Sequence, residues 1–142
     1  PNRALFNDRL EQLLGRRDPP EVTVIYCDLD RFKSVNDEYG HLEGDHLLEV
    51  TAARLNAAVR VEDTVARLGG DEFAVIVQGH DALLVAERIA TRIVEELRRP
   101  VLIGSADVPI SVSVGVARAR SGVDGARTVM RDADEAMYRA KR

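Results

Sequence analysis

One short apolar segment constrains the fold of this chain more than any other feature. Residues 21–27 read Glu-Val-Thr-Val-Ile-Tyr-Cys, and their largely apolar side chains alternate onto both faces of an extended strand. A strand that is apolar on both faces needs structure packed against each face, so it belongs at the centre of a sheet. Asp28 and Asp30 follow it directly. The sequence therefore predicts a covered strand whose carboxyl end presents acidic side chains.

Hydrophobic periodicity divides the rest of the chain. Apolar residues recur at helical spacing in four segments, at residues 6–14, 48–59, 86–97 and 130–140. Runs that favour β-structure form two pairs separated by glycine-containing turns, 64–68 with 73–77 and 101–103 with 110–116. The second member of the last pair alternates apolar and small residues, which predicts a half-buried strand. The segment between Asp28 and Asp45 is too polar and glycine-rich for a core element.

The order of these elements is helix, strand, helix, hairpin, helix, hairpin, helix. Adjacent hairpins require antiparallel pairing, which disfavours a Rossmann-like fold. We therefore expect one α/β (α+β) domain over residues 1–142, with a central mixed or antiparallel sheet of about five strands flanked by helices.

Composition excludes several classes of function. The formal net charge of −4 argues against a nucleic-acid partner or direct contact with an anionic membrane, because both need a basic surface. Cys27 is the single cysteine and cannot form an internal disulfide, which suits a reducing, cytoplasmic location. No apolar stretch approaches the span of a bilayer. The start Pro1-Asn2-Arg3 leads us to expect a domain excised from a longer protein.

Two pairs of acidic residues suggest a cation site. Asp28 and Asp30 end the central strand, and Asp71 and Glu72 lie at the tip of a hairpin that turns at a Gly-Gly pair. Mg²⁺ takes one or two carboxylates and leaves its other positions to water and phosphate. A single acidic pair in a turn is most simply a solvated loop. Two such pairs, one beside Gly-Gly, favour a metal that binds a triphosphate.

The polar segment also contains groups that suit a guanine edge. Asn36 offers a donor and an acceptor together, and Asp45 can accept from adjacent N–H groups. Guanine presents such donors at N1 and N2, and adenine does not. The two residues therefore favour guanine, provided that they lie close together.

These motifs resemble a known family. The sequence reads Asp-x-Asp-x-Phe-Lys-x-x-Asn-Asp-x-x-Gly-His-x-x-Gly-Asp over residues 28–45 and Arg-Leu-Gly-Gly-Asp-Glu-Phe over 67–73. Motifs of this length and spacing resemble the GGDEF family of diguanylate cyclases over nearly the whole chain. The resemblance implies a palm-like nucleotidyl-cyclase fold that condenses two GTP molecules into cyclic di-GMP and two pyrophosphates. It also implies Mg²⁺ or Mn²⁺ as the metal and a homodimer, since each domain holds one GTP.

The resemblance assigns binding roles position by position. Asp28, the Leu29 carbonyl and Asp71 resemble the metal ligands of the family. Asn36 and Asp45 resemble its guanine-binding residues, in agreement with their chemistry.

Catalytic and phosphate-binding roles follow from the same motifs. Glu72, next to Asp71, resembles an acid that helps to deprotonate the 3′-hydroxyl group, although a metal could lower the pKa of that group without it. Lys33 resembles a residue that stabilises transition-state charge. Phosphate contacts are implied for Phe32, Lys33 and Lys141. An ordinary exposed lysine remains the alternative for both lysines.

A second ligand site is also implied. Arg60 and Asp63 precede the hairpin as in family members with a product-inhibition site, and Arg88 resembles a supporting arginine that could pair with phosphate or stack on guanine. The simpler interpretation is an arginine at a helix end and an aspartate in a turn.

Three functions remain open at this point. The chain could be an active cyclase, a catalytically silent GTP- or cyclic di-GMP-binding module that controls an attached domain, or a domain used only for oligomer contacts. The family usually opens with Asp-x-Leu-Thr-Gly-Leu and continues through Gly-Arg-Asn after the last helix, and neither flank is present. Turnover by this segment alone is therefore an open question, and we expect dimerisation to be driven from outside it.

Overall fold

The computed structural model describes residues 2–120 and 123–141. Within them, helices and strands follow one another in this order: α1 (Arg3–Leu14), β1 (Val22–Asp30), α2 (Phe32–Tyr39), α3 (His41–Ala58), β2 (Thr64–Gly69), β3 (Glu72–Gln78), α4 (Ala82–Leu97), β4 (Val101–Ile103), β5 (Ala106–Val108), β6 (Ser111–Arg118) and α5 (Ala126–Ala140). None of the described helices combines the length and apolar character needed to cross a membrane.

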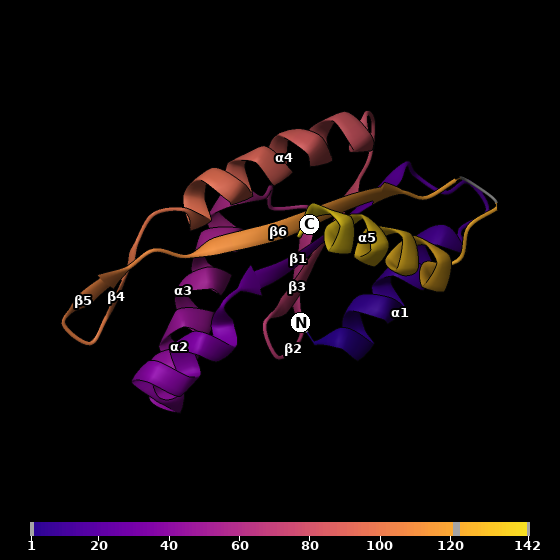
Figure 1. The fold of residues 1–142 in the computed structure, drawn as a ribbon. Coiled ribbons are helices and arrows are strands. Elements are labelled where there is room, and N and C mark those ends of the chain that lie inside the picture. Colours follow the sequence, from indigo (N-terminus) through magenta and orange to yellow (C-terminus); the bar gives the residue numbers. More distant parts are fainter. Residues whose placement is uncertain (1, 121–122, 142) are drawn as a thin grey trace.

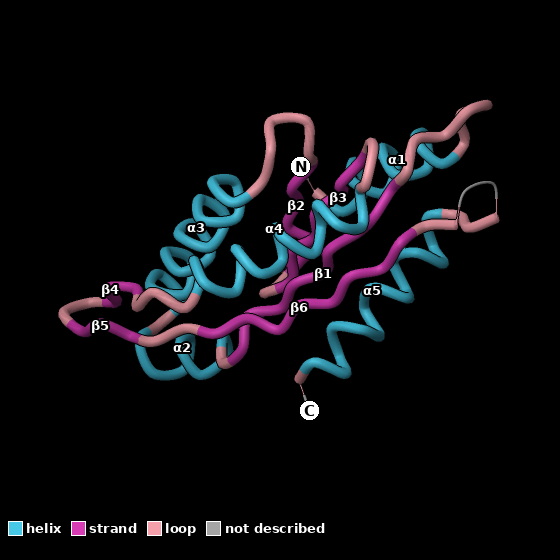
Figure 2. The backbone as a smooth tube through the Cα atoms, turned by 90° about the horizontal axis from the view of Figure 1, so that it is seen from above, coloured by secondary structure: helices cyan, strands magenta, loops and turns pink. Residues whose placement is uncertain are grey.

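The main sheet has four strands in the order β2-β3-β1-β6, and every pairing in it is antiparallel. Helices α3 and α4 cover one face, and α1 and α5 cover the other (Figure 1). Figure 2 shows β1 and β6 running side by side, with α5 along β6. This arrangement confirms the expected α/β class and the central, covered position of β1.

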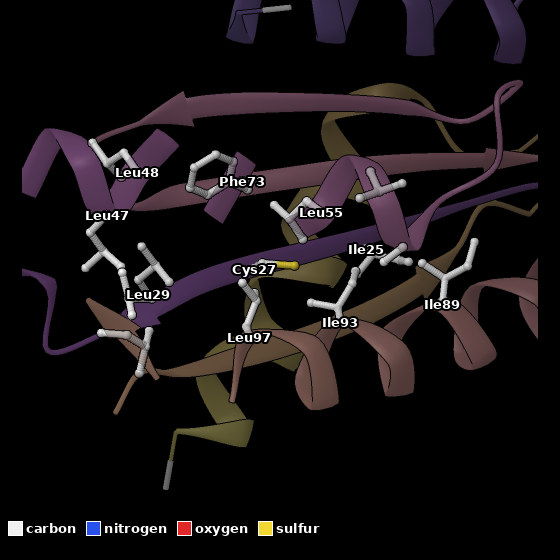
Figure 3. Packing of buried hydrophobic residues seen from close by; sticks show 14 of the residues in the cluster. Ile25, Cys27, Leu29, Leu47, Leu48, Leu55, Phe73, Ile89, Ile93 and Leu97 are labelled. Atoms are coloured by element: carbon white, nitrogen blue, oxygen red, sulfur yellow. The ribbon is translucent and has the colours of Figure 1, made fainter. Parts of the chain in front are cut away.

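The two faces of β1 supply the two hydrophobic clusters. Cys27 lies on the α3 and α4 side, among Leu55, Ile93 and Leu97 (Figure 3). Burial raises the pKa of its thiol to about 12, so the thiol stays protonated and unreactive. Val22, Val24 and Tyr26 point to the other side and pack with α1 and α5. Alternation along one strand therefore connects both layers of helices.

Two sequence-based expectations about the elements were wrong. The polar segment after Asp30 contains helix α2, which buries Val35 and packs Phe32 and Tyr39 partly against the core. Residues 101–103 do not pair with 110–116, because Gly104, at φ 62°, lets them turn back tightly onto 106–108. The hairpin β4–β5 stands apart from the main sheet, which consequently has four strands rather than about five.

Strand β6 is covered more completely than its alternation suggested. Ser113 and Gly115 are buried, while Val112, Val114 and Val116 are partly buried against the α3 and α4 layer. A Cβ atom at Gly115 would lie 2.7 Å from the Met137 Cα and closer still to backbone atoms of α5. The missing side chain therefore lets the α5 backbone rest directly on the sheet.

Candidate functional site

The end of β1 and the tip of the β2–β3 hairpin form one acidic site. Asp28 is directly opposite Glu72 in the β1–β3 register, and the Leu29 amide donates to the Asp71 carbonyl over 3.1 Å. Gly69 and Gly70 have φ values of 139° and 52°, which suit glycine and close the turn. The structure thus brings the strand-end acids and the hairpin acids together, although they lie far apart in the sequence.

Asp28 has one carboxylate oxygen that is satisfied and one that is not. Its side chain is largely buried, and the Lys141 ammonium donates to Oδ2. The other oxygen, Oδ1, is buried without a hydrogen-bond partner among the described residues. Burying a charged oxygen without a partner costs free energy. A cation beside Oδ1 would remove that cost.

Asp71 supplies the second carboxylate. Burial, followed by the neighbouring Asp28 carboxylate, raises the pKa of Asp71 to about 6, and the positive charge of Lys141 acts in the opposite direction. Two carboxylates that repel each other are a suitable pair of ligands for a divalent cation. Nowhere in the described segments do three acidic, histidine or cysteine side chains gather as a metal cluster. Two carboxylates, one of them with a buried oxygen that has no partner among the described residues, match what Mg²⁺ takes from a protein when water and phosphate supply its other ligands.

Asp30 is engaged differently from Asp28. Its two oxygens accept hydrogen bonds from Ser111 Oγ at 2.8 Å and Ser113 Oγ at 2.9 Å. Of the two strand-end acids, Asp28 is therefore the one with an oxygen left for a cation. Sequence reasoning missed this role of the serines, because their alternation suggested a polar face turned to solvent.

The chain turns from β1 into an exposed helix N-terminus. Arg31 adopts a left-handed conformation with φ 65°, which is strained for a non-glycine residue and reverses the chain sharply. No side chain caps α2, so the amides of its first turn, at Phe32 and Lys33, have no capping partner. Such N–H groups favour an anion such as phosphate. The Lys33 side chain is exposed, whereas Phe32 is partly buried.

A hollow of about 340 Å³ lies between α3 and the β2–β3 hairpin. It is lined by Asp45, Leu48, Glu49, Ala52, Arg67 and Phe73. Its apolar residues could contact a flat base while Asp45 accepts from the edge of that base. Asn36 lies on the neighbouring α2, with its amide against Gly44, the residue before Asp45. The structure thus places both predicted guanine-binding residues at the α2–α3 junction.

Glu72 contacts a residue that sequence reasoning did not single out. Arg3, at the start of α1, lies with Nη2 3.8 Å from Glu72 Oε1, and its Nε donates to the Leu68 carbonyl over 3.2 Å. Burial and then the Glu72 charge raise the pKa of the nearby Tyr26 to about 12, so Tyr26 remains a neutral phenol. Arg3 therefore holds the hairpin from the face covered by α1.

Arg67 was also not predicted as part of the site. Its Nε donates to the Gly70 carbonyl over 3.0 Å, so it braces the hairpin tip while lining the hollow. Its position two residues before the Gly-Gly turn was the available signal for this role.

The predicted second site lies at the other end of the hairpin. The Arg60 guanidinium bonds both oxygens of Asp63, at 3.2 Å and 2.9 Å, and also the Gln78 carbonyl. The Asp63 side chain is fully buried, while that of Arg60 is 35% exposed. Hydrogen bonding to Asp63 raises the pKa of Arg60 further. Arg88 is exposed on α4, and Arg92, one turn later, donates to the Ala58 carbonyl near Arg60.

Comparisons with known proteins identify the family of the chain. The family model described as "Diguanylate cyclase, GGDEF domain" matches residues 1–142. The bifunctional diguanylate cyclase/cyclic di-GMP phosphodiesterase MucR of Pseudomonas aeruginosa is 43% identical over 143 residues, which cover 99% of this chain and 21% of MucR. Diguanylate cyclase TpbB of the same species is 42% identical over 149 residues, which cover 100% of this chain and 33% of TpbB.

Solved structures extend the comparison to the fold. The crystal structure of the TpbB GGDEF domain has a TM-score of 0.90 at 38% identity, covering 99% of this chain and 89% of that one. The GGDEF domain of DgcB from Caulobacter crescentus, in complex with c-di-GMP, has a TM-score of 0.88 at 30% identity, covering 99% and 84%. The chain spans between about a fifth and a third of the length of the curated relatives named above. From the motifs, the fold and these matches together, the chain belongs to the GGDEF diguanylate cyclase domain family.

Proposed function

We propose that this domain condenses two molecules of GTP into cyclic di-GMP with release of two pyrophosphates, as one half of a homodimer. The observation that carries the proposal is the convergence of Asp28 and Asp71 beside the uncapped N-terminus of α2. A cation site next to an anion site suits a metal-bound triphosphate. The naming of TpbB and MucR as diguanylate cyclases supports the same reaction.

Each part of the site would bind one part of the nucleotide. Asn36 and Asp45 would contact the guanine edge, and the amides of Phe32 and Lys33 would bind the phosphates. Lys141, whose ammonium already lies at Asp28, adds positive charge at the same place. A divalent cation held by Asp28, Asp71 and the Leu29 carbonyl would neutralise triphosphate charge and lower the pKa of the attacking hydroxyl group. These contacts account for the choice of GTP.

The chemistry requires two copies of the site. In each half-reaction the 3′-oxygen of one nucleotide attacks the α-phosphorus of the other, a phosphodiester bond forms, and pyrophosphate leaves. Glu72, the first residue of β3, would take the proton of that hydroxyl group, and the Lys33 ammonium would stabilise the charge on the transferring phosphate. One domain holds one GTP, so the reacting groups meet only when two domains face each other.

Arg60, Asp63 and Arg88 would form a product-binding site. Asp63 fixes the Arg60 guanidinium in one orientation and leaves about a third of that side chain exposed. A planar guanidinium held in this way can pair with phosphate or stack on guanine. The c-di-GMP complex of DgcB shows that a relative binds this product.

Turnover by the longest native polypeptide that contains this domain tests the proposal. With GTP and Mg²⁺ we expect cyclic di-GMP and pyrophosphate in a ratio of one to two, and we expect Asp71→Asn to abolish both. Glu72→Gln is expected to slow turnover while leaving binding of 3′-deoxy-GTP, which cannot condense, unchanged. Binding of that analogue by a dimer that yields no cyclic di-GMP from GTP would instead identify a silent nucleotide-binding regulator.

A further inference from the structure

Gly44 lies inside helix α3, where glycine is normally unfavourable. Its amide donates to the Gly40 carbonyl over 3.1 Å within the first turn, and its backbone does not require a positive φ. Glycine in a helix costs about 1 kcal/mol relative to alanine. The backbone therefore gives no reason for glycine at this position, and the reason must lie in what faces it.

The Asn36 amide occupies the space that a side chain at position 44 would need. A Cβ atom at Gly44 would overlap Asn36 Oδ1 and lie 2.8 Å from its Cγ, and the three nearest atoms all belong to this amide. No backbone atom of α2 is among them. The close approach therefore involves the end of one side chain, which could rotate away if Gly44 were larger.

The side-chain amide of Asn36, which lies against Gly44, is available to a ligand. Within the described part of the chain, no protein group is hydrogen-bonded to the Asn36 side chain. The backbone of Asn36 is fixed, since its carbonyl accepts from the Gly40 amide at the end of α2. Asp45 follows Gly44 directly and lines the hollow of about 340 Å³. Gly44 therefore sets how closely the Asn36 amide approaches α3, at the residue before Asp45.

We propose that Gly44 is a specificity-determining residue, which positions the Asn36 amide so that Asn36 and Asp45 contact one guanine edge together. The inference rests on the proposed function, because it assumes a guanine nucleotide in this hollow. Any side chain at position 44 would push the amide off α3 and separate the two groups. Guanine would lose a contact, whereas adenine, which does not match these groups, would lose none.

Binding of 3′-deoxy-GTP and 3′-deoxy-ATP with Mg²⁺, measured by calorimetry on the full polypeptide, tests this role. We expect Gly44→Ala to weaken the guanine analogue about tenfold, the scale of one hydrogen bond lost, and to leave the adenine analogue unchanged. The melting temperature should stay the same or rise, because alanine favours the helix. Ala53→Ser, which enlarges an exposed residue of the same helix, is the control and should change neither affinity.

A double-mutant cycle separates positioning from simple obstruction. Asn36→Ala alone should weaken the guanine analogue as much as Gly44→Ala does, and the two changes together should cost no more than either one. Additive losses, an unchanged guanine preference in Gly44→Ala, or loss of its cooperative unfolding would each overturn the inference. If wild type bound the guanine and adenine analogues equally well, the proposed function itself would fail. If wild type preferred guanine and Gly44→Ala bound the guanine analogue as tightly as wild type, only the role of Gly44 would fail.

Discussion

At the scale of single residues, the carboxylates of the acidic site are destabilised in a way that a bound cation would relieve. Asp28 keeps a buried oxygen without a partner in the described residues, and its carboxylate makes ionisation of Asp71 harder. Lys141 compensates only part of this cost, through one oxygen of Asp28. The free energy that these groups lose in the metal-free domain is what a bound cation would recover.

Asp71 should stabilise the metal-free domain less and less as pH rises from about 4 to about 6, because its pKa is raised from 3.8 to about 6. A raised carboxyl pKa means that the folded state binds the proton more tightly than the unfolded state. Protonated Asp71 therefore stabilises the fold fully below the unfolded pKa, and this stabilisation is lost as the pH rises through the folded pKa. Asp71→Asn, which resembles the protonated carboxyl group, should be more stable than wild type at pH 7.5 and should flatten this dependence. Urea unfolding with a chelator at several pH values measures both effects, and equal wild-type and variant profiles would contradict them.

Arg3 should act on turnover through Glu72. The exposed ion pair to Glu72 contributes less than about 1 kcal/mol and the hydrogen bond to the Leu68 carbonyl about 1 kcal/mol, so Arg3→Ala should lower the free energy of unfolding by no more than about 2 kcal/mol. If the guanidinium orients Glu72, kcat should fall about tenfold while KM for GTP stays constant, and Arg3→Lys should restore part of the loss. In a Glu72→Gln background the Arg3→Ala change should have little further effect. A full additional loss there would show that Arg3 acts through its bond to the Leu68 carbonyl instead.

At the scale of elements, the site depends on how closely α5 approaches the sheet. Ala133 and Met137 of α5 are packed over Gly115 of β6, and Lys141 follows at the end of the same helix. The position of one ammonium group at Asp28 is therefore set by a glycine in a different element.

Gly115→Ala should displace α5 and destabilise the domain. The added Cβ atom would meet backbone rather than a mobile side chain, and overpacking of this kind costs about 1–3 kcal/mol. Because Lys141 moves with α5, nucleotide binding should weaken as well. Gly125→Ala, at the start of α5 with no atom within 4 Å of the added Cβ, is the matched control. Chemical unfolding and binding of 3′-deoxy-GTP measure the two effects, and wild-type values for both would show that α5 adjusts without strain.

Strong local patterns made some elements predictable, and long-range contacts hid others. The apolar strand before Asp28 and the Gly-Gly turn before Asp71 each carry their signal within a few residues, so their positions in the site follow from the sequence. Helix α2 has only eight residues and buries only Val35, too little for a clear hydrophobic period. The hydrogen bond from Arg3 to the Leu68 carbonyl joins residues 65 positions apart, and no local sequence pattern predicts such a contact.

At the scale of the whole molecule, the two proposed ligand sites lie at opposite ends of strand β2. Asp63 precedes the strand, and Gly69 at its other end opens the turn that carries Asp71. Six residues of extended chain span about 20 Å, so a ligand at Arg60 does not overlap a nucleotide at the hairpin tip. Product bound there would act without displacing GTP.

Cyclic di-GMP should therefore lower kcat without raising KM for GTP, and Arg88→Ala should relieve the inhibition. Arg88 is the better position to change, because Arg60→Ala would remove the side-chain partner of the buried Asp63 carboxylate, leave it only the backbone amide of residue 60, and destabilise the fold. Arg88→Ala should weaken cyclic di-GMP about tenfold or more, as expected for a lost contact to a charged group, while unfolding and 3′-deoxy-GTP binding stay as in wild type. Arg98→Ala, at the exposed end of α4, controls for charge. Competition between cyclic di-GMP and 3′-deoxy-GTP for one site would contradict this separation, since the two ligands would then share the hairpin tip.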